Sequence, residues 1–200
     1  MRAILAGTLF VISLVAGAQD GAWRDSLESY WAKLDREFAD PEHSPLDSAD
    51  REAFDHLHRF PADPAFRVLA RFKPARKVRS FGMRTSTDRV PEYRKVGVLH
   101  FMLDGRKEEL HVYQNVKLSE QEPYRNYFFV PFTDLTNGEE TYGGGRYLDL
   151  WGPLGEQVEL DLNRAYNPYC AYSHRYSCPI PPAENHLPLR VTAGVLKFHD

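Results

Sequence analysis

The sequence predicts an α+β fold that is mainly β, in which an antiparallel sheet curls into a barrel or sandwich with two N-terminal helices packed on it. Two observations lead to this expectation. Apolar side chains recur with the period of a helix before residue 58, and apolar and polar side chains alternate with the period of a strand from residue 66 onward. The chain has 200 residues, of which 42% are hydrophobic, so it suits one domain with a sizeable core.

The first 18 residues have the pattern of a secretory signal peptide. Arg2 provides a positive charge, residues 3–15 form an apolar run, and residues 16–18 are small, as is typical of a cleavage site. We therefore expect export to the periplasm or the extracellular space, cleavage before Gln19, and one folded domain over residues 19–200. The run is too short to span a bilayer, so stable membrane insertion is not expected after cleavage.

The charge balance argues against a nucleic-acid partner. The formal net charge is −3, and the 25 lysines and arginines form no dense cluster. Proteins that bind nucleic acid neutralise phosphates with a basic surface, which this composition does not provide.

Two helices are expected before the sheet. The first carries one apolar stripe over about four turns, formed by Trp23, Leu27, Tyr30, Trp31, Leu34 and Phe38. Pro41 ends this helix, because proline cannot continue the hydrogen-bond ladder. Asp47 is the predicted N-cap of a second, shorter helix that carries Phe54 and Leu57.

About eight strands are expected after the helices. They are predicted at residues 66–72, 77–81, 96–103, 109–113, 127–132, 146–150, 158–162 and 189–193. The third and fourth flank Asp104-Gly105, a dipeptide typical of a tight hairpin turn. A two-residue turn would place Phe101 opposite Glu108, whereas a four-residue loop would place it opposite Leu110. The apolar match favours the longer loop.

Residues 161–187 are expected to form a long ordered loop, because four prolines lie among many tyrosines and asparagines. Export would place Cys170 and Cys178 in an oxidising compartment, which predicts a disulfide between them. A zinc site that includes His174 is a second interpretation, although the spacing matches no standard zinc motif. Free or redox-active thiols are the third.

Several motifs carry a family resemblance. The runs VPFTDLT (130–136), ETYGGGRYL (140–148), AYNPYCAY (165–172) and CPIPP (178–182) closely resemble the uncharacterised bacterial family numbered 1684 among the domains of unknown function, DUF1684. The likeness covers most of the chain after the signal, and Leu162 departs from the aromatic residue usual in that family. The resemblance implies one DUF1684-like domain over residues 19–200 and carries over no established reaction, ligand, cofactor or catalytic residue.

Two polar motifs contain the candidate ligand-binding residues, which are Asp134, Glu140, Tyr142, Arg146, Tyr166 and Asn167. Carboxylates beside an arginine can hold a polar ligand or act as acid and base, and consecutive glycines at 143–145 can expose backbone N–H groups to an anion. If strands 146–150 and 158–162 pair as a hairpin, the two motifs emerge at the same end of the sheet. The alternative is structural, with a buried ion pair at Arg146 and close packing at the glycines.

The sequence therefore predicts an exported protein that binds a small polar ligand between the glycine-rich loop and the Tyr/Asn/Cys loop. One alternative is a hydrolase with Asp134 or Glu140 as general base, although the sequence contains neither G-x-S-x-G nor H-E-x-x-H. A structural or partner-binding envelope protein is the other alternative. No metal or other cofactor is expected, and the sequence leaves the oligomeric state open.

Overall fold

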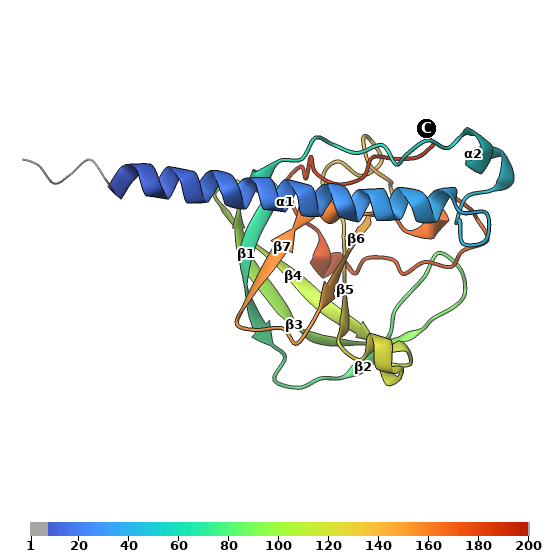
Figure 1. The fold of residues 1–200 in the computed structure, drawn as a ribbon. Coiled ribbons are helices and arrows are strands. Elements are labelled where there is room, and N and C mark those ends of the chain that lie inside the picture. The colour runs from blue at the N-terminus through green and yellow to red at the C-terminus, as the bar shows by residue number, and fades with distance from the viewer. Residues whose placement is uncertain (1–7, 200) are drawn as a thin grey trace, which may run out of the picture.

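The computed structural model describes the backbone of residues 8–199 and the side chains of residues 20–199. Helix α1 (Thr8–Ala39) lies across the curled sheet, and its first turns project past the body of the molecule (Figure 1). The first part of the predicted signal peptide, residues 1–7, lies outside the described residues. Within the described part of the chain, no helix is long and apolar enough to cross a membrane.

The predicted apolar stripe on α1 is confirmed. Trp23, Leu27 and Trp31 are each 4% exposed and Phe38 is 2% exposed, so one face of the helix is buried along four turns. This face packs on the loops at one end of the sheet, where Leu57 and the C-terminal segment complete the cluster. The helix ends shortly before Pro41, as expected.

The second helix is shorter than predicted. Helix α2 covers only Ser48–Ala53, and Asp47 stands at its N-cap position without a side-chain capping bond. Its carboxylate instead accepts a hydrogen bond from the Ser173 hydroxyl at 2.9 Å. Phe54 and Leu57 follow the helix instead of belonging to it. Leu57 is buried in the core, and its backbone N–H donates a hydrogen bond to the Asp35 carboxylate.

Within residues 8–199, seven strands form one antiparallel sheet. They are β1 (Arg67–Pro74), β2 (Ser80–Gly82), β3 (Glu92–Leu103), β4 (Arg106–Asn115), β5 (Tyr127–Phe132), β6 (Arg146–Trp151) and β7 (Gln157–Asp161). The order is β6-β5-β4-β3-β1-β7, with β2 paired to β3. The sheet curls into a half-barrel around a core of leucines, valines and phenylalanines, so the mainly β, curled prediction is confirmed.

The β3–β4 hairpin uses the two-residue turn, so the preference for the longer loop was wrong. Phe101 lies opposite Glu108, and Leu99 lies opposite Leu110. Asp104 and Gly105 both have positive φ, 49° and 70°, which a two-residue primed turn requires and an Asp-Gly pair tolerates. The turn chemistry therefore outweighed the pairing of Phe101 with an apolar partner.

Strands β6 and β7 lie at opposite edges of the sheet, so the predicted hairpin between them is also wrong. β6 pairs with β5, and β7 pairs with β1. Curling of the sheet nevertheless brings the segment after β7 back beside β6. There Tyr147 and Tyr166 exchange backbone hydrogen bonds of 2.9 and 3.0 Å. The loops that precede β6 and follow β7 therefore still meet.

Candidate functional site

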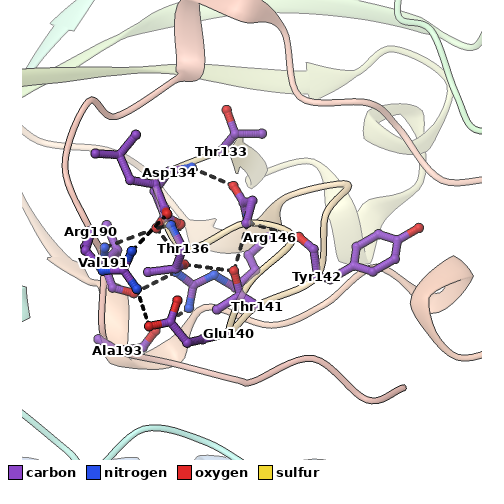
Figure 2. Close-up of polar contacts among 12 residues, drawn as sticks. Thr133, Asp134, Thr136, Glu140, Thr141, Tyr142, Arg146, Arg190, Val191 and Ala193 are labelled. Carbon is purple, nitrogen blue, oxygen red and sulfur yellow. Dashed lines mark hydrogen bonds and ion pairs between the residues drawn. The ribbon is translucent and has the colours of Figure 1, made fainter. Parts of the chain in front are cut away.

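Arg146, at the start of β6, is a structural centre rather than an exposed ligand contact (Figure 2). Its side chain has no exposed surface, and its Nη2 lies 2.8 Å from Asp134 Oδ2. The same nitrogen donates to the Val191 carbonyl at 2.9 Å, and Nη1 donates to the Ala193 carbonyl. The arginine thus ties the β5–β6 loop to the C-terminal segment.

The Asp134 carboxylate is fully used by this network. Its Oδ1 accepts hydrogen bonds from the Thr136 N–H at 2.8 Å, the Thr136 hydroxyl at 2.6 Å and the Val191 N–H at 3.1 Å. Asp134 and Arg146 together therefore occupy the N–H and carbonyl of Val191 and the carbonyl of Ala193. The segment 189–193 cannot then pair as a sheet strand, which corrects the prediction of an eighth strand there.

Glu140 and the glycines also have structural contacts. Glu140 pairs with Arg190, which reaches Glu139 at 3.0 Å as well. Gly145 has φ +88°, and a Cβ there would lie 2.6 Å from the Phe132 carbonyl oxygen. These glycines permit close packing, as the structural alternative proposed. The Tyr142 ring, by contrast, points away from the cluster around Arg146 (Figure 2).

Tyr166 and Asn167 lie apart from Arg146's contacts. The Tyr166 hydroxyl donates to Asp149 Oδ1 at 2.7 Å, and the Tyr127 hydroxyl donates to the same oxygen at 2.7 Å. Asn167 is buried and donates to the Leu196 carbonyl at 2.9 Å. The structure therefore brings Asp134 to Arg146 but does not gather the six predicted residues around one opening.

Tyr142 borders a cavity of about 450 Å³, which we call the thiol cavity. It lies where the loop before β6 meets the segment after β7, α2 and the C-terminal residues. Its lining residues are Asp47, Asp50, Ser86, Thr87, Tyr142, Cys170, Ala171, Tyr172, Ser173, His174, Tyr176, Phe198 and His199. The cavity thus combines aromatic rings, hydroxyl groups, two carboxylates and one thiol.

Cys170 lines this cavity with Cys178 beside it, and both are free thiols in the structure. The Cys170 N–H donates to Cys178 Sγ at 3.1 Å, and the Tyr142 hydroxyl lies 3.7 Å from Cys170 Sγ. Cys178 is held in turn by residue 86, because its N–H donates to the Ser86 hydroxyl at 3.1 Å. The predicted disulfide between the two cysteines remains a prediction.

The contacts between the two cysteines shift their pKa values in opposite directions. The interaction with Cys178 lowers the pKa of Cys170 to about 6, partial burial opposes it, and a smaller lowering comes from Tyr142. The pKa of Cys178 is raised, first by its hydrogen bond to Cys170 and then by burial. The pair therefore loses its first proton more readily than an ordinary thiol and its second less readily.

The carboxylates of the thiol cavity come from α2 and its N-cap. Asp47 accepts from Ser173 and lies 3.4 Å from the Arg175 guanidinium, and Asp50 lies 3.3 Å from His199. Within residues 20–199, no group of three or more His, Cys, Asp and Glu side chains is arranged to hold a metal ion. Sequence reasoning missed these carboxylates. They lie more than 120 positions from the loop that they face, and no local pattern marks them.

The comparisons with known proteins agree with the motifs. The family model described as "Protein of unknown function (DUF1684)" matches residues 52–196. The solution NMR structure of an uncharacterised protein from Haloarcula marismortui is 36% identical, has a TM-score of 0.70, and is matched over 90% of this chain and 96% of that chain. No curated protein matches. The chain therefore belongs to the DUF1684 family of proteins of unknown function.

Proposed function

We propose that the protein binds a small polar ligand in the thiol cavity, and that this ligand carries a positive charge. The composition of the lining carries the proposal. Four aromatic rings, from Tyr142, Tyr172, Tyr176 and Phe198, surround an opening that also contains two carboxylates. Aromatic faces and carboxylates both attract organic cations, and a cavity of this size suits a small molecule.

The carboxylates have only partial partners. The Asp47 side chain is 60% exposed despite its contact with Arg175, and Asp50 faces a histidine that is charged only when protonated. The two carboxylates of the lining therefore favour a cation over an anion. The Cys170 sulfur adds to this preference whenever it is a thiolate.

The other two functions have less support. A hydrolase would need an accessible base, but the Asp134 side chain is fully buried and hydrogen bonded, and Glu140 is paired with Arg190. A purely structural loop would fill its own interior, whereas the loop around Cys170 borders an open cavity. Export of the protein is a separate proposal, which the N-terminal pattern supports.

A thermal-shift comparison of charge-matched compounds tests the ligand proposal. We expect choline, agmatine and other small organic cations to raise the melting temperature, and acetate and phosphate to leave it unchanged. A ligand at a hundred times its Kd adds about 2.7 kcal/mol to the free energy of unfolding. The shift should be lost in Asp50→Asn and retained in Glu52→Gln, which removes an exposed carboxylate from the same helix. Stabilisation by the anions alone, or equal shifts in both variants, would contradict the proposal.

A further inference from the structure

We propose that Cys170 and Cys178 form a thiol–disulfide exchange pair, in which Cys170 attacks small-molecule disulfides that reach the thiol cavity and Cys178 resolves the product. This inference goes beyond the binding of a cationic ligand and does not depend on that ligand. It assigns a reaction to two cysteines that contact each other and differ in their exposure to solvent.

The first observation is the unequal access to the two sulfurs. Cys170 lines the thiol cavity and is partly exposed, whereas Cys178 is 8% exposed and is not among the lining residues. A disulfide that enters the cavity therefore meets Cys170 first. Cys178 lies behind it, in the position of a second thiol that can react only after Cys170 has done so.

The second observation is the closeness of the two side chains. Cys178 Sγ lies 3.1 Å from the backbone nitrogen of Cys170, whose N–H donates a hydrogen bond to it. Cys170 stands in the short 3₁₀ turn Tyr169–Ala171 (η5), and Cys178 belongs to a segment held against residues 84–86. Rotation about the side-chain bonds of Cys170 and Cys178 can bring the two sulfurs to bonding distance without unfolding the loop.

The third observation is the set of donors around Cys170. The neighbouring Cys178 side chain favours its ionised form most, followed among the favourable contacts by the Tyr142 hydroxyl, which lies 3.7 Å from Cys170 Sγ, and the thiolate is the form that attacks a disulfide. Tyr93, Tyr147 and Tyr169 also interact electrostatically with the pair, and the charge of the more distant Arg89 acts on Cys178. Cys170 is thus the better nucleophile of the two on grounds of both access and ionisation.

The reaction balances without a cofactor. The Cys170 thiolate attacks one sulfur of RSSR, an S–S bond forms between Cys170 and that sulfur, and RS⁻ leaves. Cys178 then gives up its proton and attacks the Cys170 sulfur, which releases the second RS⁻ and forms the Cys170–Cys178 disulfide. The two thiol protons pass to the two RS⁻ groups. The protein dithiol is oxidised by two electrons, and RSSR is reduced to two RSH.

Single-cysteine variants of the reduced protein test the order of attack. Incubated with oxidised glutathione, Cys178→Ser should accumulate one glutathione adduct on Cys170. Cys170→Ser should react about tenfold or more slowly, because Cys178 is both shielded and less ionised. The wild type should accumulate the internal disulfide instead of the adduct, as mass spectrometry of acid-quenched samples would show. Equal adduct formation in the two variants, or a stable adduct in the wild type, would overturn the proposal.

A second measurement separates exchange from a permanent staple. In mixtures of reduced and oxidised glutathione, the folded wild type should interconvert between dithiol and disulfide with one midpoint potential. A bond that resists reduction until the protein unfolds would be structural, and the exchange proposal would then fail. Both measurements use glutathione and no cationic ligand, so failure here leaves the ligand proposal standing, and the reverse also holds.

Tyr142→Phe tests the activation of Cys170 specifically. Loss of the hydroxyl should move the pH profile of Cys170 alkylation upward, and a shift of about one pH unit slows alkylation about tenfold below the pKa. Tyr113→Phe is the matched control, since it removes a hydroxyl that donates to Glu184 outside the cavity. A merely structural role for Tyr142 would leave the pH profile in place, and that result would remove the activation step from the proposal.

Discussion

At the residue scale, Arg146 and Arg190 should contribute very differently to the free energy of unfolding. Arg146 is fully buried, and each of its terminal nitrogens has a protein acceptor. Arg190 pairs with Glu139 and Glu140 at the surface, where water and salt weaken the attraction. Loss of one partner from the buried pair leaves an uncompensated charge, whereas loss of the surface pair leaves hydrated groups.

Arg146→Ala should therefore lower the free energy of unfolding by about 3–5 kcal/mol. The variant strands the buried Asp134 carboxylate and frees the carbonyls of Val191 and Ala193. Arg190→Ala should cost only a small part of that loss. Urea denaturation of both variants beside the wild type measures the difference. A near-wild-type midpoint for Arg146→Ala would show that this residue does not hold the loops together.

Cys170 gives a pH dependence at the same scale. Its folded pKa of about 6 lies below the value of about 8.5 expected in the unfolded chain, so the unfolded state binds more protons between these pH values. The stability of the reduced wild type, relative to Cys170→Ser, should therefore increase from pH 6 to 8.5 and be lost as the pH falls through 6. Denaturant melts in a reducing buffer check this, and a flat difference would contradict the assigned ionisation.

At the element scale, the glycine-rich loop is shaped by close packing of the backbone. Gly145 and Gly138 both have positive φ, but a Cβ would meet the Phe132 carbonyl at Gly145 and nothing within 4 Å at Gly138. Left-handed backbone costs a residue with a side chain about 1–2 kcal/mol. Gly138→Ala should lower the free energy of unfolding by only this amount, and Gly145→Ala should lower it clearly more. Equal melting temperatures for the two variants would mean that the loop relaxes freely around position 145.

Local patterns predicted the elements that follow from the periodicity of their own residues. The stripe of Trp23, Leu27 and Trp31 predicted α1, and alternation or, at residues 127–132, a continuous apolar run predicted the seven strands that form the sheet. Segment 189–193 has an apolar pattern similar to a strand, but its backbone groups bond to Arg146 and Asp134. Such a competition between side-chain and strand partners is decided by residues 45–57 positions away, which a local pattern does not contain.

The candidate site was predictable in part for the same reason. The loop that contains Tyr166, Asn167 and Cys170 was expected to be functional, and Cys170 and Tyr142 do border the thiol cavity. Arg146, the residue with the most obvious polar motif, is buried instead. The sequence alone does not distinguish a charged loop residue that faces a ligand from one that faces a buried carboxylate, because the fold determines which partner the residue meets.

At the scale of the whole molecule, α1 is part of the domain even though the family model begins at residue 52. Its Trp23 indole donates to Asp161 Oδ2 at 2.8 Å, and its Asp35 pairs with Arg59 at 3.0 Å. The helix covers one side of the half-barrel, where its buried tryptophans complete an apolar cluster with Leu57 and Val195.

This arrangement predicts where the chain can be shortened. Protein that begins at Gln19, the expected product of signal cleavage, keeps all the α1 side chains that are buried among residues 20–39 and should melt at the same temperature as the full chain. Removal of residues 1–39 takes away Trp23, Leu27, Trp31 and Phe38, and each such loss costs about 2–5 kcal/mol. Their combined cost exceeds the total stability of about 5–15 kcal/mol typical of a domain, so this shorter protein should not fold. Circular dichroism and thermal melts of the two proteins compare them directly. A cooperative melt without α1 would mean that the sheet and its loops form a domain without the helix. N-terminal sequencing of exported protein would separately identify the cleavage site.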